Sequence, residues 1–315
     1  MSAQIIAFVN AKGGVGRTTL VIHCAGYLAA AGLRPLVVDN DSRCNLTQIM
    51  VTKDDLRTIK RSDIGLVYER RPGPPPGRIV RKTRFNNLFL IPATPNLSTH
   101  DHRGSLLGEY PNQGLRKFLQ HVKPQFDLIL IDCTAWNGPL TEAALVAADA
   151  VIIPVQAGVV GTMGLQETLE FVEVVRSRFN PGLRLCGIVV TMRDARSKEM
   201  PKHEAQLRSA HGDAVFPAAI PSLSAFAKEP IVGRNGRLKF DTNILRDPRP
   251  EMEVFTNEVL SRMGSPKRIF GGKASTITDD AADGGPSGTT EALSIEKPLL
   301  GEDDFDSNAG CWQLG

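Results

Sequence analysis

Short apolar runs alternate with helix-like patterns along the first part of the chain. Apolar runs at residues 4–10 and 34–38 predict two buried strands, and the apolar spacing between them predicts a helix over residues 18–31. Gly32 is expected just beyond the helix end, where the absence of a side chain permits a left-handed backbone. Parallel strands need a crossover of this length, so the first forty residues are predicted to form a β-α-β unit.

The alternation continues to about residue 190 and indicates the fold class. Further strands are predicted at residues 88–91, 128–131, 150–154 and 185–191. Further helices are predicted near residues 113–122, 140–147 and 162–178. Strands that alternate with helices in this way indicate an α/β protein with a doubly wound, mostly parallel sheet flanked by helices.

Two stretches depart from this pattern. Residues 51–80 are weakly patterned, and the proline-rich residues 71–77 are predicted to form an irregular surface loop, because proline cannot donate a sheet hydrogen bond. Residues 265–315 are rich in Gly, Ser, Thr, Asp and Glu. Such a segment buries too little apolar surface to offset its chain entropy, so we predict an acidic, disordered tail there.

Charge and cysteine content narrow the class of protein. Nine acidic and two basic residues lie beyond residue 271, a balance of −7, so the net charge of +3 leaves +10 on residues 1–271. A basic body is compatible with a polyanionic partner. The five cysteines include no C-x-x-C pair, which argues against a disulfide framework or a zinc site. The sequence shows neither a signal peptide nor a membrane-spanning run, so a cytoplasmic location without a membrane partner is expected.

The candidate chemistry begins directly after the first predicted strand. The segment reads Lys12-Gly13-Gly14-Val15-Gly16-Arg17-Thr18-Thr19. Glycines between a strand and a helix let successive backbone N–H groups point at phosphate oxygens, and the helix N-terminus adds its positive end. Thr18 is placed to offer a hydroxyl to Mg²⁺. The segment therefore predicts a site for nucleotide phosphates.

This segment resembles the deviant phosphate-binding loop of the ParA/MinD superfamily of P-loop ATPases, and in particular the ParA/Soj-type partition ATPases. The resemblance implies ATP and Mg²⁺ as ligands, and it implies that Lys12 reaches across a sandwich homodimer to the partner subunit's nucleotide. The family carries a second lysine at the position of Arg17, where it contacts the β- and γ-phosphates. Arginine keeps the charge but presents a wide planar fork in place of a compact ammonium group.

Two later strand ends carry the carboxylates that the resemblance requires. In the family, the aspartate at Asp39 belongs to the metal and switch region, and the aspartate at Asp41 helps to place the attacking water. Asp132 follows the apolar run 126–131 and is expected to hold Mg²⁺. The family usually continues Pro-Gln-Gly-Asn after the second aspartate, whereas this chain reads Ser42-Arg43-Cys44-Asn45. Where the family has two prolines after the Mg²⁺ ligand, this chain reads Cys133-Thr134-Ala135-Trp136.

The resemblance extends over about residues 4–260, so residues 1–264 are predicted to form one P-loop ATPase domain. In relatives, the segments that correspond to Met192 and Pro221 border the adenine. Relatives that bind DNA carry a basic residue after an Ile-Pro motif, where this chain has Ser222. Eight basic residues are candidates to replace it: Arg193, Arg196, Lys198, Lys202, Lys228, Arg234, Arg237 and Lys239.

These motifs predict a switch that dimerises with ATP and hydrolyses it when an adaptor of the ParB type stimulates it. Such a switch would bind DNA without sequence preference, join the nucleoid in its ATP form, and partition plasmid or chromosomal DNA or position another large cargo. The alternative is a degenerate nucleotide-binding scaffold that hydrolyses little. Arg17 and the altered switch loops favour the scaffold, whereas the retained lysine, threonine and aspartates favour the switch. The acidic tail disfavours a MinD-like membrane ATPase.

Overall fold

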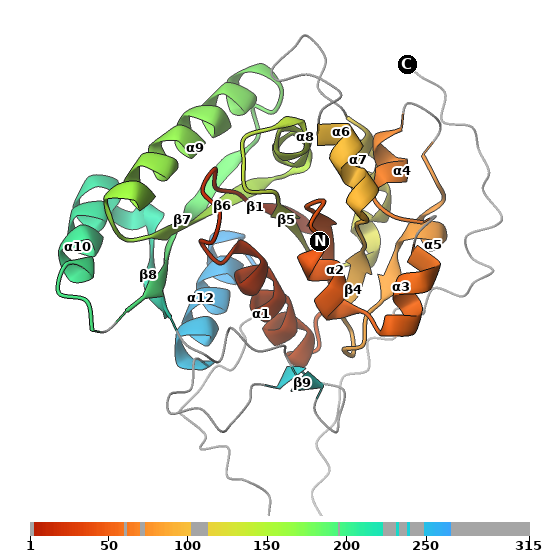
Figure 1. Cartoon of the computed structure of the whole chain (residues 1–315), viewed down its shortest axis with the longest axis horizontal. Helices are drawn as coiled ribbons and strands as arrows, with labels where there is room; N and C mark the ends of the chain where they lie inside the picture. The colour runs from red at the N-terminus through yellow and green to blue at the C-terminus, as the bar shows by residue number, and fades with distance from the viewer. Residues whose placement is uncertain are drawn as a thin grey trace, which may run out of the picture.

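A computed structural model of the chain describes residues 3–59, 62–69, 73–101, 113–194, 196–222, 231–232, 238–239 and 249–265 (Figure 1). Its centre is an eight-stranded sheet in the order β3-β4-β2-β5-β1-β6-β7-β8. Every neighbouring pair is parallel except β3 and β4, which are antiparallel. The prediction of a doubly wound, mostly parallel sheet is therefore confirmed.

The strands and helices have the following bounds. The strands are β1 Gln4–Phe8, β2 Pro35–Asn40, β3 Arg81–Lys82, β4 Phe89–Ile91, β5 Leu128–Cys133, β6 Ala150–Gln156, β7 Arg184–Arg193, β8 Val215–Pro221, β9 Ile231–Val232 and β10 Leu238–Lys239. The helices are α1 Arg17–Ala30, α2 Asn45–Met50, α3 Lys53–Ile59, α4 Gly65–Tyr68, α5 Pro76–Ile79, α6 Ser98–Asp101, α7 Gly114–Val122, α8 Pro139–Ala147, α9 Val159–Arg178, α10 Met200–His211 and α12 Arg249–Arg262. Three short 3-10 turns are Pro95–Leu97, Lys123–Gln125 and Gly212–Ala214.

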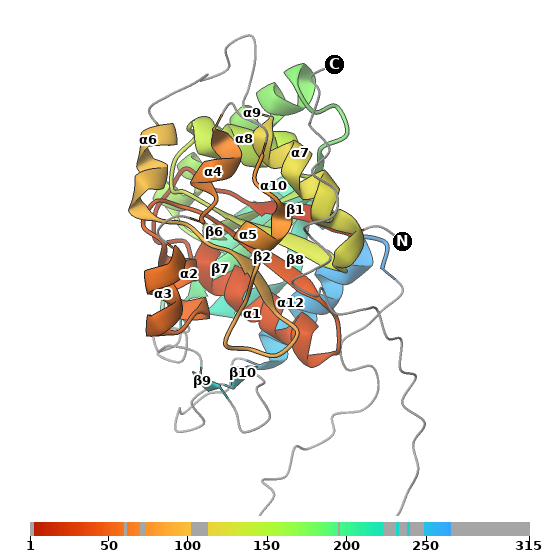
Figure 2. The same cartoon turned by 90° about the vertical axis from the view of Figure 1, so that its right-hand side faces the viewer.

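The central strands are apolar throughout because the sheet is covered on both faces. Along β1, Ile5 and Ala7 face a core with α7, α8 and α9, whereas Ile6 and Phe8 face a second core with α1 and α12. Figure 2 shows the sheet between these two helical layers. Side chains of a strand point alternately to opposite faces, so a run without polar residues supplies both cores at once.

The predicted strands and helices are all present, with ends that differ by a few residues. Gly32 follows α1 with φ of 81°, as its predicted place beyond the helix requires. The helices α2 to α6, α10 and α12 and the strands β3, β8, β9 and β10 were not predicted. Among the described residues, no helix combines the length and the apolar character that a membrane span needs.

One local prediction is wrong. Pro76 and Gly77 do not belong to an irregular surface loop, because they open helix α5, and Pro76 is buried. Proline fits this place because the first N–H groups of a helix need no partner within the helix. Residues 71 and 72 lie outside the described residues, as does all of the predicted tail except Ser265. The domain boundary at residue 264 stays a prediction.

The last described helix packs on the sheet through apolar side chains and is also hydrogen-bonded to it through one arginine. Arg262 of α12 donates Nη1 to the carbonyls of Cys186 and Ala214, at 2.9 and 3.2 Å, and Nη2 to the carbonyl of Asp213, at 2.9 Å. Its guanidinium carbon lies 4.3 Å from the centre of the Phe216 ring. These contacts join α12 to β7 and to the segment that enters β8.

We predict that Arg262→Met lowers the free energy of unfolding by about 1–3 kcal/mol, because methionine keeps much of the packing but leaves the carbonyls without their donor. Urea unfolding of the full chain measures the change. Arg176→Met is the control, because Arg176 pairs with Glu173 on the exposed side of α9, so its replacement should lower the free energy of unfolding much less. Equal losses in the two variants would contradict the role given to Arg262.

Candidate functional site

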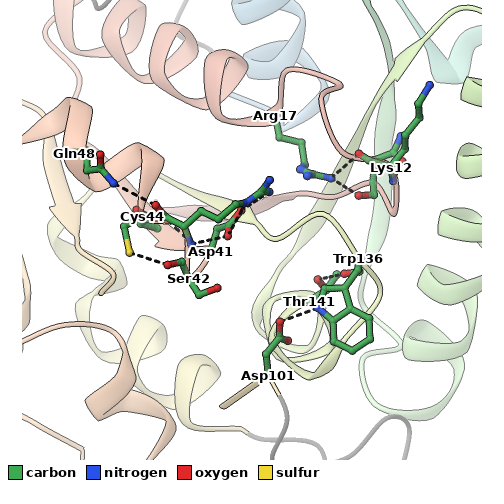
Figure 3. A network of polar contacts seen from close by, with 12 residues as sticks. Lys12, Arg17, Asp41, Ser42, Cys44, Gln48, Asp101, Trp136 and Thr141 are labelled. Carbon is green, nitrogen blue, oxygen red and sulfur yellow. Dashed lines mark hydrogen bonds and ion pairs between the residues drawn. The ribbon is translucent and has the colours of Figure 1, made fainter. Parts of the chain in front are cut away.

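The predicted site residues gather at the carboxyl ends of the central strands. The loop that leaves β1 enters α1, and the ends of β2 and β5 lie beside it in the sheet. In open α/β sheets, ligands bind outside this edge. Figure 3 shows the side chains of this region, from Lys12 and Arg17 to Asp41 and Trp136.

Two glycines shape the loop between β1 and α1. Gly14 and Gly16 have φ angles of 77° and 79°, a left-handed backbone that strains other residues. A Cβ atom on Gly16 would also lie 3.3 Å from Cε of Met192. At the same end of β7, Thr191 donates its hydroxyl to the carbonyl of Val15 at 2.8 Å. The loop therefore rests on β7, and Met192 lies beside it.

A second set of bonds fixes the start of the loop. Asn10 donates Nδ2 to the carbonyl of Pro154 at 2.7 Å and accepts from the backbone N–H of Lys12 at 2.7 Å. Thr168 of α9 accepts from the backbone N–H of Ala11 at 3.0 Å. Asn10 and Thr168 were missed in the sequence, although an asparagine directly after a buried strand was a usable signal. Together they hold the loop in place without a ligand.

Arg17 is buried inside this loop. Its Nη1 donates to the carbonyl of Asn10 and, at 3.2 Å, to that of Lys12. Burial lowers the pKa of Arg17, and the nearby Asp132 and Asp41 act in the opposite direction. The guanidinium is therefore turned toward the backbone of the loop itself. Its partners there are neutral carbonyls, so an incoming phosphate would offer a stronger, charged partner.

Asp132 is the residue best suited to hold Mg²⁺. It is 2% exposed, its side chain is hydrogen-bonded with Thr18, and among the described residues its Oδ1 has no hydrogen-bond partner. Burial and the neighbouring Asp39 raise the pKa of Asp132 to about 8. A buried carboxylate oxygen without a partner is costly, and a divalent cation relieves that cost. The arrangement fits the predicted Mg²⁺ site of Thr18 and Asp132.

Asp39 lies opposite Asp132 on the adjacent strand, but its oxygens are engaged. Oδ2 accepts from the backbone N–H and hydroxyl of Thr47, at 2.8 and 2.6 Å, and Oδ1 accepts from the backbone N–H of Asp41 at 3.3 Å. Burial raises the pKa of Asp39 to about 7. In this arrangement the carboxylate of Asp39 holds α2 and the loop before it. Of the two carboxylates, Asp132 is the one with an oxygen that has no hydrogen-bond partner among the described residues.

Asp41 faces the same edge and is paired with Arg43, whose Nη2 lies 2.7 Å from Oδ2 of Asp41. Pro221 is buried at the end of β8, in register with Arg193 of β7. The backbone N–H of Ser222 donates to the carbonyl of Arg193 at 2.9 Å. The structure thus places Pro221 beside β7, the strand that ends at Met192 and Arg193.

The candidate basic residues are largely neutralised where they are described. Arg193 pairs with Glu204 at 3.2 Å, Arg196 with Asp194 at 3.1 Å, and Lys202 with Glu199 at 3.0 Å. Lys198 is exposed, and Lys239 lies in β10. The remaining candidates lie outside the described residues: Lys228, Arg234 and Arg237.

The loop after β5 is held by hydrogen bonds that sequence analysis missed. Trp136 donates Nε1 to Asp101 at 2.7 Å, and its carbonyl accepts from the hydroxyl of Thr141, also at 2.7 Å (Figure 3). Asn40 donates Nδ2 to the carbonyl of Leu140 at 2.9 Å. These bonds restrain a loop that is stiffened by two prolines in the family it resembles.

The chain resembles known proteins in sequence over more than half of its length. A family model described as an AAA domain matches residues 3–185. The chain is 38% identical over 231 residues to the chromosome-partitioning ATPase Soj of Thermus thermophilus, and the match covers 73% of this chain and 85% of that protein.

Solved structures share the fold. Cobyrinic acid a,c-diamide synthase from Mycobacterium smegmatis, solved with ADP and magnesium, matches with a TM-score of 0.62 and 26% identity, over 71% of this chain and 89% of that one. McdA from Cyanothece, solved as an aspartate-to-alanine variant with ATP, matches with a TM-score of 0.67 and 20% identity, over 85% and 99%. The second likeness shows the fold alone.

The raised pKa values of Asp39 and Asp132 predict a pH dependence of the ligand-free protein. Both values lie above the ordinary 3.8, so the stability that these groups contribute is present below about pH 4 and lost as pH rises through 7 and 8. At pH 8 and in EDTA, we expect Asp132→Asn to unfold with a free energy about 1–3 kcal/mol higher than the wild type, since each pKa unit corresponds to about 1.4 kcal/mol and relaxation reduces the effect.

The measurement is urea unfolding at pH 5 and pH 8 without nucleotide. Asp54→Asn, on the exposed surface of α3, is the control. Its free energy of unfolding should change between pH 5 and pH 8 by the same amount as that of the wild type. If the free energy of unfolding of Asp132→Asn has the same pH dependence as that of the wild type, burial of the Asp132 carboxyl does not destabilise the protein.

Proposed function

The chain belongs to the Soj/ParA family of chromosome-partitioning ATPases, and we propose that it is an ATP-driven dimerising switch that partitions DNA or positions another large cargo. The observation that carries this proposal is the buried Oδ1 of Asp132, which has no hydrogen-bond partner among the described residues and lies beside Thr18 and the phosphate loop. The relatives' ATPase chemistry requires a divalent cation at such a place.

In this proposal, the loop from Lys12 to Thr19 binds the phosphates of ATP. Arg17 would leave the loop carbonyls and pair with the phosphates, whose full charge makes them the stronger acceptor. Thr18 and Asp132 would hold Mg²⁺, with Asp39 behind them, and the ion would neutralise phosphate charge. Asp41 would orient the attacking water, so that ATP is hydrolysed to ADP and phosphate.

Lys12 is the residue proposed to link nucleotide binding to dimerisation. Its backbone N–H is held by Asn10, and Gly164 of α9 packs against it so closely that an added Cβ would lie 3.2 Å from Cβ of Lys12. Its side chain points away from Arg17 and Asp41 (Figure 3). A lysine that is fixed at its base and directed away from its own phosphate site supports a role at the partner subunit's nucleotide.

Cargo and adaptor complete the proposed cycle. Met192 and Pro221 would border the adenine, and the +10 balance of residues 1–271 supports binding to the DNA backbone without sequence preference. A ParB-like adaptor would stimulate hydrolysis and release the dimer. In a cell, the protein would stay in the cytoplasm and associate with the nucleoid in its ATP form.

The second candidate, a nucleotide-binding scaffold that hydrolyses little, has one observation in its favour. Both oxygens of Asp41 are occupied by Arg43. If that pair never opens, ATP would bind and dimerise the protein without turnover. The two candidates differ in the release of phosphate and agree on dimerisation.

We predict that ATP with Mg²⁺, but neither ADP nor nucleotide-free buffer, converts the protein to a dimer that binds non-specific duplex DNA. Lys12→Ala should weaken ATP-dependent dimerisation at least about tenfold, the factor that corresponds to roughly 1.4 kcal/mol, because a charge-assisted contact to phosphate is lost. Light scattering gives the mass and fluorescence anisotropy gives DNA binding in the same samples. Lys53→Ala on exposed α3 is the matched control.

Three results separate the hypotheses. A dimer that releases phosphate supports the switch, and DNA binding that falls steeply with salt supports phosphate-backbone contacts. A dimer that releases no phosphate, alone or with its adaptor, supports the scaffold. No effect of ATP on mass or DNA binding would contradict both.

A further inference from the structure

The end of β2 holds an ion pair that closes a functional carboxylate. Asp41 Oδ1 accepts from the backbone N–H and Nε of Arg43, at 2.9 and 3.2 Å. Oδ2 accepts from Nε and Nη2 of Arg43, at 3.1 and 2.7 Å. A carboxylate offers about four acceptor positions, and here one arginine supplies contacts to both oxygens.

The surroundings distinguish this pair from an ordinary surface contact. The Asp41 side chain is 8% exposed and that of Arg43 is 55% exposed, so the arginine covers a buried carboxylate from the solvent side. Arg43 also lies near the phosphate loop, since Asp132 helps to raise the pKa of Arg43 and Arg43 helps to lower the pKa of Arg17. The same spacing recurs at Asp194 and Arg196, but there the side chains are 39% and 91% exposed.

The location matters because of what Asp41 does in the proposed function. In hydrolysis, the water oxygen forms a bond to the terminal phosphorus as the bond to the bridging oxygen breaks, and the water proton passes to the phosphate product. A carboxylate orients this water only if one of its oxygens can accept a hydrogen bond from it. In the structure, both oxygens of Asp41 already accept from Arg43.

We propose that Arg43 is a positioning residue that acts as a brake, because it occupies Asp41 and keeps this carboxylate from orienting the attacking water. This inference rests on the proposed function of Asp41. It also gives a function to the change in the motif after Asp41, where the family usually has glutamine at position 43. Glutamine has no charge and no forked guanidinium with which to hold both carboxylate oxygens.

The brake is weak enough to be released. The Arg43 side chain is 55% exposed, so water and salt screen its half of the pair, and the arginine loses side-chain freedom when it is held. Salt should therefore open the pair. At saturating ATP and Mg²⁺, kcat of the wild type should rise with ionic strength more than kcat of a variant that lacks Arg43.

The test compares kcat and KM for ATP in the full-length protein. Arg43→Gln should raise kcat roughly two- to fivefold, the range that loss of such a pair can supply, with little change in KM. The kcat of Arg43→Lys should lie between those of the wild type and Arg43→Gln, because one ammonium group cannot hold both carboxylate oxygens in the same way. Arg176→Gln, which removes an exposed pair on α9, should match the wild type.

A double variant locates the effect. Asp41→Asn combined with Arg43→Gln should be as slow as Asp41→Asn alone, because the brake acts through Asp41. If Arg43→Gln leaves kcat unchanged or lowers it, the brake is wrong, and a raised KM with it would assign Arg43 to phosphate binding. Failure of the proposed function is separate, because it would appear as a wild type that neither binds ATP nor dimerises with it.

Discussion

The structure depends on carboxylates that are buried side by side at the ends of two neighbouring strands. Asp39 and Asp132 are in register on β2 and β5, and burial raises the pKa of both. Asp39 uses its oxygens to hold α2, while Asp132 keeps one oxygen without a partner among the described residues. Without a ligand the site is thus electrostatically unfavourable, and the divalent cation that we propose there would relieve this cost.

The rest of the fold keeps this arrangement in place before any ligand arrives. The phosphate loop is fixed by Asn10, by Thr168 of α9 and by Thr191 of β7. These bonds join the loop to three different elements, namely β6, α9 and β7. Preorganisation of this kind means that binding energy is not consumed in ordering the loop. The proposed function instead changes the contacts of three charged side chains, those of Lys12, Arg17 and Arg43.

Much of the fold was predictable because two faces of one sheet are buried, which leaves long apolar strands and a clear alternation with helices. The phosphate loop was predictable because its chemistry requires glycines between a strand and a helix, whereas the roles of the carboxylates at strand ends were predicted from the resemblance to the ParA/MinD superfamily. The position of Pro76 was predicted wrongly because only the inability of proline to donate a hydrogen bond in a strand was considered. That proline also fits the first turn of a helix was not considered. Thr168 and the Arg43–Asp41 pair could not be predicted, because sequence spacing does not reveal which distant hydroxyl or which rotamer completes a site.

The central claim is that the Asp132 edge is a site for ATP with Mg²⁺, and thermal unfolding tests it most directly. The unfolding midpoint should be measured for the wild type and Asp132→Asn with ATP, with Mg²⁺, with both, and with neither. At a ligand concentration about 100 times Kd, stabilisation reaches about 2.7 kcal/mol, or several degrees. We predict that the wild type gains this only with both ligands, and that Asp132→Asn loses the part that depends on Mg²⁺. A gain that is the same in both proteins, or the same without Mg²⁺, would contradict the claim.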